Sequence, residues 1–426
     1  MKLESLRITP IALGDPPLLN AGGLHAPYAL RIVLELETEV GVVGLSEIPG
    51  DSAVLAGLER VAPSMRGMSV YDQHALHELL RATLGSDGAR GDMPWDQRSL
   101  VHAESALEVA CLDAIGKRHD CRVADLLGGV VRERVPYAGY LFFKHAGAGG
   151  PLGFGEDPAA EGWARARQAA ALDVDGLVRQ ARAMIDAHGF ASLKVKAGIL
   201  EPDLEVRATL ALRETFGAEV PIRIDPNAAW SYATALREGQ RLRGAIEYYE
   251  DPVRGQSEMA RLRRELAIPL ATNMCTTSFD ELPSSIRLGS EDVLLADHHF
   301  WGGLRASMEL ARLCDTFGRE LSMHSNSHAG ISFAAMTHLG AALPKLRYAL
   351  DTHYVWQSDE IIAGGKLRID GGSVTLPDGP GLGVTLDRAA LDAAHRRYRE
   401  CGLVRRNDEV EMQKVEPGWR FSKTRY

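Results

Sequence analysis

Six polar residues recur at the ends of short apolar segments through the middle of this chain. They are Lys196, Asp225, Glu250, Asn273, Asp297 and His324, with steps of 29, 25, 23, 24 and 27 residues between them. A step of this size is about one strand plus one returning helix, and in a (β/α) barrel the carboxyl ends of all such strands lie at one rim. The spacing therefore predicts an amine, three oxygen ligands, a carboxylate and an imidazole around one pocket.

The segment LKVK places two lysines on the same face of a strand, because side chains alternate between faces along a strand. Lys194 and Lys196 would then lie close together, and each ammonium group would lower the pKa of the other. One of them could therefore act as a general base near neutral pH. Without the other five residues, an exposed edge strand would be the simpler explanation of this pattern.

Three oxygen-bearing residues occupy equivalent places in successive units: Asp225 in RIDPN, Glu250 in YYEDP and Asn273 in LATNM. Two carboxylates and one amide oxygen are hard ligands that suit Mg²⁺ and leave positions for water and substrate. Taken alone, the Asp-Pro-Asn sequence that ends at Asn227 is typical of a turn, and Glu250 could form a salt bridge. The regular spacing favours the metal site.

Asp297 and His324 follow the next two apolar segments, and neighbouring strands could bring the carboxylate onto the imidazole. Such a pair fixes the tautomer and raises the pKa of the histidine, which makes it a second acid or base. A single histidine is more often a core or surface residue. His328 lies four residues after His324, but Ser325 stands where the HExxH zinc motif has glutamate.

The surrounding sequence predicts two kinds of architecture. Residues 1–134 begin with alternating apolar and polar residues, turn near residues 38–41, and continue as helices, which indicates an α+β domain. Residues 135–384 alternate short apolar runs with amphipathic stretches, which is typical of a parallel sheet, and residues 385–426 form a helix and a tail that we expect to pack back on the first domain. Residues 145–162 are rich in glycine, alanine and proline, and we expect a loop near the barrel mouth that is a lid or is disordered.

The composition excludes several classes of protein. The net charge of −9 argues against nucleic acid or an anionic membrane as a partner, because both need clustered basic surface. The five cysteines are irregularly spaced and contain no CxxC pair, which fits a reducing compartment. The sequence contains no signal-peptide pattern and no long uncharged apolar stretch, so we expect a cytoplasmic protein.

Together the motifs resemble the enolase superfamily, and specifically its glucarate dehydratase group. The resemblance rests on NAGGLHAPYALR, YLFF, the KxK, DPN, EDP and TN motifs, ADHHFWGG, MHSNSHAGIS, DTHYVWQ, PGLGV and GLVRRND. It implies a modified TIM barrel, an α/β fold, with an α+β capping domain formed by the N-terminal segment and the C-terminal tail. It also implies Mg²⁺ held by Asp225, Glu250 and Asn273.

The same resemblance implies a role for each site residue. Lys196 would be the base on one face of the substrate and His324, supported by Asp297, the base on the other, while Lys194 and Asn227 would help to bind the substrate carboxylate. The implied substrate contacts are Asn20, His25, Ser99, Tyr140, Phe142, Ser325, His353 and Arg406. The implied activity is dehydration of an aldaric acid, D-glucarate or L-idarate, to a 2-keto-3-deoxy acid, and we expect a homo-oligomer.

Three other functions fit parts of the same pattern. A dehydratase or epimerase for a different acid sugar would use the same two bases, since bases on both faces also permit proton exchange. A homologue without catalytic activity would keep the fold, although every proposed catalytic residue is present. A Schiff-base aldolase would use Lys196 and would need no metal ligands.

Overall fold

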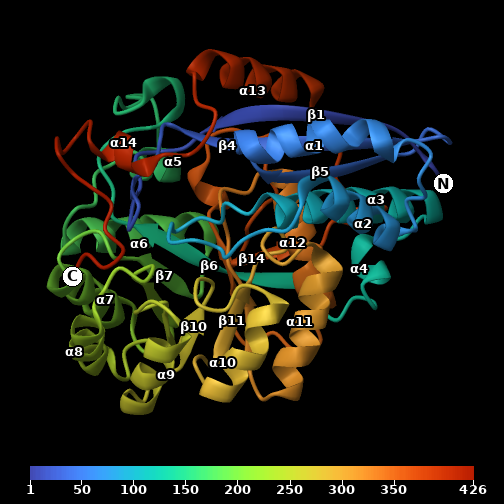
Figure 1. The fold of residues 1–426 in the computed structure, drawn as a ribbon. Coiled ribbons are helices and arrows are strands. Elements are labelled where there is room, and N and C mark those ends of the chain that lie inside the picture. The colour runs from blue at the N-terminus through green and yellow to red at the C-terminus, as the bar shows by residue number, and fades with distance from the viewer.

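A three-stranded antiparallel sheet opens the chain, as its alternating pattern predicts. In the computed structural model, which describes residues 1–426, β1 (Leu3–Gly14) pairs with β4 (Tyr28–Thr38), and β4 pairs with β5 (Val43–Pro49). The turn between β4 and β5 contains Gly41 at φ 76°, a left-handed conformation that glycine adopts without steric cost. Figure 1 shows this sheet above the barrel, with helix α13 (Arg388–Cys401) lying over it.

Three helices cover the other side of this sheet: α1 (Ser52–Met65), α2 (Gln73–Leu84) and α3 (Ser99–His119). Together with the sheet they enclose a separate hydrophobic core of 19 buried residues. Helix α3 also reaches the barrel, because the Glu108 carboxylate accepts hydrogen bonds from the backbone nitrogens of Leu304 (2.5 Å) and Arg305 (2.9 Å). The α+β region is therefore joined to the barrel through a buried acid at the first turn of helix α11 (Leu304–Thr316).

Eight parallel strands form most of the second sheet, in the order β13, β6, β7, β8, β9, β10, β11, β12, and a ninth strand, β14 (Ser373–Thr375), pairs with β6 in the antiparallel direction. The strands are β6 (Arg134–Phe142), β7 (Leu193–Lys196), β8 (Ile222–Asp225), β9 (Tyr248–Glu250), β10 (Leu270–Thr272), β11 (Val293–Ala296), β12 (Glu320–Met323) and β13 (Leu350–Thr352). The sheet is nearly closed, and only β12 and β13 are not joined by a ladder. This arrangement confirms the predicted modified TIM barrel with a separate α+β domain.

Helices return the chain between the strands, as the amphipathic stretches predict. They are α6 (Val174–His188), α7 (Pro202–Phe216), α8 (Tyr232–Leu242), α9 (Gln256–Glu265), α10 (Leu282–Leu288), α11 (Leu304–Thr316) and α12 (Gly330–Ala342). The smaller elements are β2 (Leu19–Asn20), β3 (Gly23–Leu24), α4 (Val123–Leu126), η2 (Phe279–Glu281), η3 (Tyr354–Trp356) and β14 (Ser373–Thr375). None of the helices combines the length and apolar character needed to cross a bilayer.

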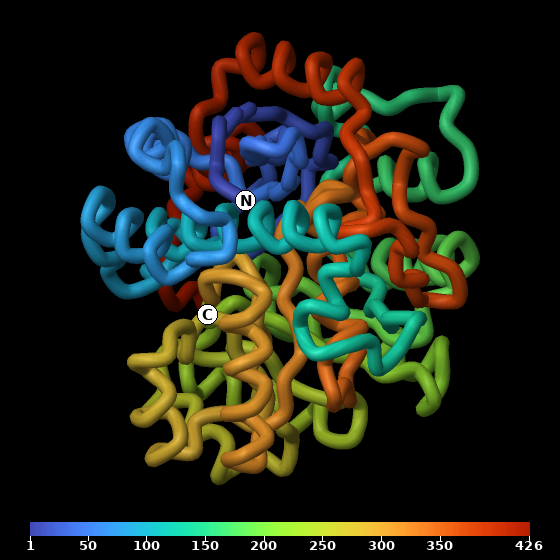
Figure 2. Tube along the Cα trace, turned by 90° about the vertical axis from the view of Figure 1, so that its right-hand side faces the viewer, coloured from blue at the N-terminus to red at the C-terminus, as the bar shows by residue number.

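The C-terminal segment touches both parts of the molecule. Helix α13 (Arg388–Cys401) lies along β1, and the short helix α14 (Asp408–Met412) lies against β3. The last residues then extend to the barrel, where Arg425 N donates to Ala229 O at 2.7 Å. Figure 2 shows this segment at the red end of the colour scale, crossing from the top of the molecule towards the barrel.

Residues 145–162 follow a defined path beside the capping sheet. They include the short helix η1 (Gly150–Leu152) and lead into α5 (Gly162–Ala166). Gly150 N donates to Pro27 O at 2.7 Å, and the Trp163 indole donates to Val355 O at 3.0 Å. These bonds connect Gly150 to the residue before β4 and connect α5 to η3, and the role of the segment as a lid stays a prediction.

The close approach of β5 to α3 generates a prediction about stability. A Cβ atom on Gly44 would lie 2.0 Å from Ala110 O and 3.0 Å from Ala114 Cβ, both on the buried helix α3. Gly44→Ala should therefore push β5 away from α3 and lower the free energy of unfolding by roughly 1–3 kcal/mol. Urea denaturation measures this change.

The matched control is Gly88→Ala, because a Cβ atom there meets nothing within 4 Å. We expect its free energy of unfolding to stay within about 0.5 kcal/mol of the native protein. Equal stability of both variants would contradict the packing of β5 on α3.

Candidate active site

The six strand-end residues lie where the spacing predicts. Lys196, Asp225 and Glu250 are the last residues of β7, β8 and β9, whereas Asn273, Asp297 and His324 directly follow β10, β11 and β12. All six side chains are buried. The carboxyl ends of the parallel strands therefore gather these groups at one end of the barrel.

The two lysines of β7 have different environments. The Lys194 ammonium lies 2.6 Å from a carboxylate oxygen of Glu250 and 2.6 Å from one of Asp351. Burial alone would lower the pKa of Lys194, but these carboxylates hold it well above its usual value. Burial lowers the pKa of Lys196, the Asp225 carboxylate 2.6 Å away opposes this shift, and the charge of Lys194 adds to it. Lys194 is thus a permanent cation, and Lys196 is the lysine with the character of a base.

An acidic cluster lies beside these lysines. Carboxylate oxygens of Asp225, Glu250 and Asp251 all lie within 4.8 Å of one another, and burial together with the charge of Asp225 raises the pKa of Glu250 well above its usual value. A bound cation would relieve this crowding of negative charge. Asn273 adds a buried Oδ1 atom that has no hydrogen-bond partner.

Asn273 is a better third ligand than Asp251. Both oxygens of Asp251 accept hydrogen bonds, one from the Thr272 hydroxyl and one from Asn273 N at 2.9 Å. Asn273 Nδ2 donates to Glu250 Oε1 at 2.8 Å, which leaves its Oδ1 free. Asp225, Glu250 and Asn273 therefore fit a hard divalent cation, and Asp251 holds the strand end that carries Asn273.

The backbone next to these ligands is strained. Only four residues other than glycine have a positive φ, and three of them are Asn227 (50°), Ala228 (56°) and Asp251 (37°). Such conformations cost roughly 1–3 kcal/mol each and cluster at functional sites. Two hydrogen bonds hold the turn, from Ala228 N to Asp251 O at 2.7 Å and from Asn227 N to Asp225 Oδ1 at 2.9 Å. This strain is a second, independent indication that the ends of β8 and β9 form a site.

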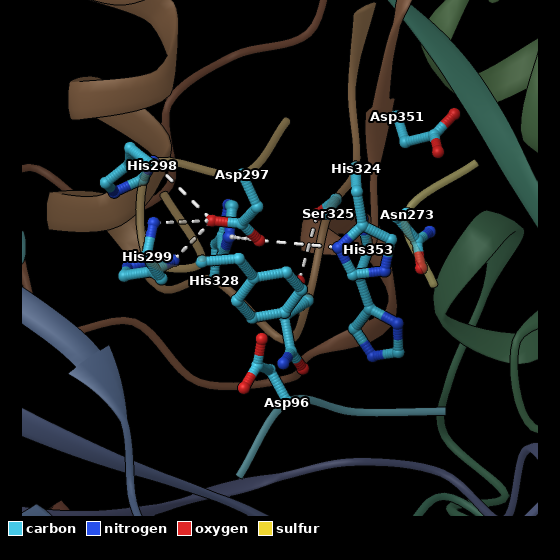
Figure 3. Close-up of polar contacts among 12 residues, drawn as sticks. Asp96, Asn273, Asp297, His298, His299, His324, Ser325, His328, Asp351 and His353 are labelled. Carbon is cyan, nitrogen blue, oxygen red and sulfur yellow. Dashed lines mark hydrogen bonds and ion pairs between the residues drawn. The ribbon is translucent and has the colours of Figure 1, made fainter. Parts of the chain in front are cut away.

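Asp297 contacts several histidines, as Figure 3 shows. Its Oδ2 lies 3.4 Å from His324 Nδ1, and its Oδ1 lies 2.7 Å from His299 Nδ1. Burial lowers the pKa of His324 to about 4, although Asp297 opposes this shift. The expectation that Asp297 raises the pKa of His324 above its usual value is therefore wrong, because burial outweighs the carboxylate. The result is a neutral imidazole that can accept a proton.

Lys196 and His324 line one pocket at this end of the barrel. Its wall also contains most of the residues that the family resemblance implies, namely Asn20, His25, Tyr140, Phe142, Ser325, His353 and Arg406. Ser99 does not line this pocket and is the half-buried first residue of α3. Lys194 and Asn227 do not line it either and lie behind it beside the acidic cluster. The substrate contacts remain predictions.

The end of the pocket away from the lysines is built from the capping elements. Arg406 Nη2 lies 2.5 Å from His25 Nε2, so His25 accepts at Nε2 and carries its proton on Nδ1, which donates to Asp15 at 3.2 Å. Burial and the charge of Arg406 lower the pKa of His25, which fits this neutral tautomer. Arg406 also forms two hydrogen bonds with Asp408, at 2.8 and 2.6 Å, and lies over the Trp95 ring.

Several of these residues are absent from the sequence-based prediction. Asp351 lies in the next strand, β13, 27 residues after His324, so the same spacing could have revealed it. Asp15 accepts hydrogen bonds from both His25 and His353, and no spacing or motif points to it. Its role appears only when the capping segment lies over the barrel.

Two family descriptions match the chain. Residues 25–128 match the family of N-terminal domains of mandelate racemase and muconate lactonizing enzyme. Residues 176–390 match the family described as enolase C-terminal domain-like.

Individual relatives extend over the whole chain. A probable glucarate dehydratase from Streptomyces coelicolor is 42% identical and covers 98% of this chain and 97% of its own length. A solved enolase from Thermobispora bispora, in complex with magnesium and formate, is 44% identical with a TM-score of 0.93 and covers 100% of both chains. A solved enolase from Pseudomonas fluorescens, with bound magnesium, potassium and tartrate, is 42% identical with a TM-score of 0.92 and covers 100% of this chain and 99% of its own.

The burial of His324 generates a prediction about pH. Its pKa is about 4 in the native protein, against about 6.5 in an unfolded chain, so unfolding takes up a proton between these values. His324 therefore contributes stability above about pH 6.5 that is lost as the pH falls towards 4, and its share between pH 7 and 5 is about 2 kcal/mol. His324→Gln should show a smaller loss of unfolding free energy over this interval in urea titrations.

The control is His74→Gln, because His74 is exposed on α2. It should lose as much stability between pH 7 and 5 as the native protein. If His324→Gln behaves in the same way as His74→Gln, the imidazole of His324 is not buried in its neutral form.

Proposed function

The chain belongs to the enolase superfamily and to its glucarate dehydratase-like group, and we propose that it is a Mg²⁺-dependent dehydratase of D-glucarate and its epimer L-idarate. An enzyme of the hydro-lyase class that acts on an acid sugar is consistent with the 42% identity over nearly the full length. The observation that carries the proposal is that Lys196 and His324, from β7 and β12, line one pocket beside a buried acidic cluster.

Mg²⁺ is supported by the donor set and by the neighbours. Asp225, Glu250 and Asn273 offer two carboxylates and an unpartnered amide oxygen, and magnesium is present in the related enolases from Thermobispora bispora and Pseudomonas fluorescens. When bound, Mg²⁺ would act as a Lewis acid that stabilises negative charge on the substrate carboxylate. Lys194 would add a second, permanent positive charge near the same place.

The chain's own residues would then move protons. The hydrogen next to a carboxylate is very weakly acidic, so a base must remove it while the developing negative charge is stabilised. Lys196 Nζ would take this proton on one face of the substrate and neutral His324 on the other. The bond from the neighbouring carbon to its hydroxyl oxygen then breaks, the oxygen leaves as water after receiving a proton, and the resulting enol becomes the 2-keto-3-deoxy acid.

A substrate with two carboxylates fits the ends of the pocket. Arg406 and His25 line the end built from capping elements, and Lys196 lines the end beside the acidic cluster. The Pseudomonas fluorescens enolase holds tartrate, which is a dicarboxylic hydroxy acid. Because Asp408 already pairs with Arg406, we expect the distal carboxylate to be recognised by hydrogen bonds more than by net charge.

Turnover of a panel of acid sugars tests this function. We expect D-glucarate and L-idarate to give a 2-keto-3-deoxy acid with Mg²⁺, no turnover in EDTA, and recovery when Mg²⁺ is restored. D-gluconate, which lacks the distal carboxylate, should react with a lower kcat/KM because remote binding groups contribute to the transition state. Product analysis with a 2-keto acid reagent and mass spectrometry measures the loss of water.

Asn273→Ala is the matched variant for the metal assignment, because it removes the unpartnered oxygen and leaves both carboxylates. It should need more Mg²⁺ for half-maximal activity than the native enzyme. Full turnover in chelator would contradict the metal assignment. Interconversion of the epimers without loss of water would instead identify an epimerase, which the same pair of bases permits.

A further inference from the structure

His299 joins the proposed base pair to the capping sheet. Its Nε2 lies 2.9 Å from Glu47 O on β5 and 3.0 Å from Ser332 Oγ on α12. The Ser332 hydroxyl donates to the same Glu47 carbonyl at 2.7 Å, and Arg31 donates to Ser332 Oγ at 3.1 Å. Because a carbonyl oxygen can only accept a hydrogen bond, the 2.9 Å contact with Glu47 O calls for a proton on His299 Nε2, whereas the Ser332 hydroxyl at 3.0 Å can act as donor or acceptor.

The other ring nitrogen of His299 faces a carboxylate. His299 Nδ1 lies 2.7 Å from Asp297 Oδ1, and both side chains are fully buried. If Nδ1 carried no proton, its lone pair would point at a buried anion at hydrogen-bond distance, which is strongly unfavourable. A positive charge must therefore lie between these two atoms.

A proton satisfies this geometry better than a metal ion. Asp297, His299 and His328 together could be taken for a metal-binding group, since their ligand atoms lie within 4.8 Å of one another. Two tetrahedral zinc ligands with bonds of about 2.0–2.2 Å lie roughly 3.3 Å apart. The 2.7 Å between Nδ1 and Oδ1 is the length of a charge-assisted hydrogen bond instead.

We propose that His299 is a positioning residue that is protonated on both ring nitrogens, takes up most of the charge of Asp297, and thereby keeps His324 a weak, neutral base. The part of this inference that concerns His324 rests on the proposed function. Asp297 lies 2.7 Å from His299 but 3.4 Å from His324, so its strongest hydrogen bond goes to the residue that does not line the pocket. Asp297 then mainly fixes the orientation of the His324 ring and raises the pKa of His324 only weakly.

Of the two carboxylates near His299, Asp297 and Glu47, only Asp297 is not paired with an arginine. The rings of His298 and His328 lie 3.9 and 5.0 Å from its ring centre. Glu47 forms a buried ion pair with Arg31 at 2.6 Å, so these two charges largely cancel.

The proton is favoured for the pair as a whole. Burial lowers the pKa of His299 to about 4 even though Asp297 opposes that shift, so the second ring proton is held by the 2.7 Å contact with Asp297 Oδ1 and not by the imidazole alone. A shared proton leaves the pair without net charge, whereas its loss would leave an isolated buried anion.

The charged groups that face His324 would no longer be balanced without this proton. They are Asp297, which raises the pKa of His324, and Lys194 and Lys196, which lower it. Replacing His299 by glutamine keeps a hydrogen-bond donor but removes the positive charge. Asp297 would then act on His324 with its full charge, and the pKa of His324 should rise by roughly 1 unit.

The first experiment is direct and does not depend on catalysis. In ¹⁵N-histidine-labelled native protein at pH 7, proton–nitrogen NMR spectra should show one histidine with protons on both ring nitrogens. Its signals should disappear in His299→Gln and remain in His338→Gln, a control in which an equally buried histidine on α12 is changed. If His299 carries one ring proton in the native protein, the proposal is overturned, even where the variants fold poorly.

The second experiment measures the consequence for His324. The pH dependence of α-hydrogen exchange in deuterium oxide should move upward by roughly 1 pH unit in His299→Gln for the epimer served by His324. The epimer served by Lys196 should keep its profile, and His338→Gln should keep both. An unchanged profile in His299→Gln overturns the proposal. Absence of exchange for either epimer in the native protein contradicts the proposed function instead, and the NMR result still decides the protonation of His299.

Discussion

The ion pairs of Lys194 are the interaction on which the site depends. Its ammonium group is fully buried and lies 2.6 Å from both Glu250 and Asp351, while Arg223 lies 3.3 Å from the second oxygen of Asp351. Removing one partner from such a buried group leaves an uncompensated charge and costs several kcal/mol. The pairs therefore hold strands β7, β8, β9 and β13 in a fixed relation at the barrel mouth.

The same group separates the roles of two neighbouring lysines. Lys194 is stabilised as a cation by several carboxylates, and its charge in turn lowers the pKa of Lys196, which has one close partner. The acidic cluster retains an unpartnered oxygen on Asn273, so a divalent cation can complete it. One arrangement of charges thus prepares a base, a permanent cation and a metal site.

The capping elements take part in the site and do more than cover it. His25, Trp95 and Arg406 come from the N-terminal region and the C-terminal segment, and all three line the pocket. Glu47 and Arg31 reach the Asp297 region from the capping sheet through Ser332 and His299. Changes in the packing of the capping sheet can therefore affect the barrel residues directly.

Much of this arrangement is predictable because a strand and its returning helix have a limited length. The steps between Lys196, Asp225, Glu250, Asn273, Asp297 and His324 carry that information, and the structure places all six at strand ends. The pKa of His324 was not predictable, because it depends on the depth of burial. The contact between Asp15 and His353 joins residues 338 positions apart and leaves no periodic signal in the sequence.

Hydrogen exchange tests the central claim, that Lys196 and His324 act on opposite faces of one substrate. The measurement is incorporation of deuterium at the α-carbon of D-glucarate and of L-idarate in deuterium oxide, by NMR, for Lys196→Ala and His324→Ala. Each variant should lose exchange for one epimer, by roughly 10²–10⁴-fold, and keep it for the other. Loss of exchange for the same epimer in both variants, or for both epimers in each, would contradict the account.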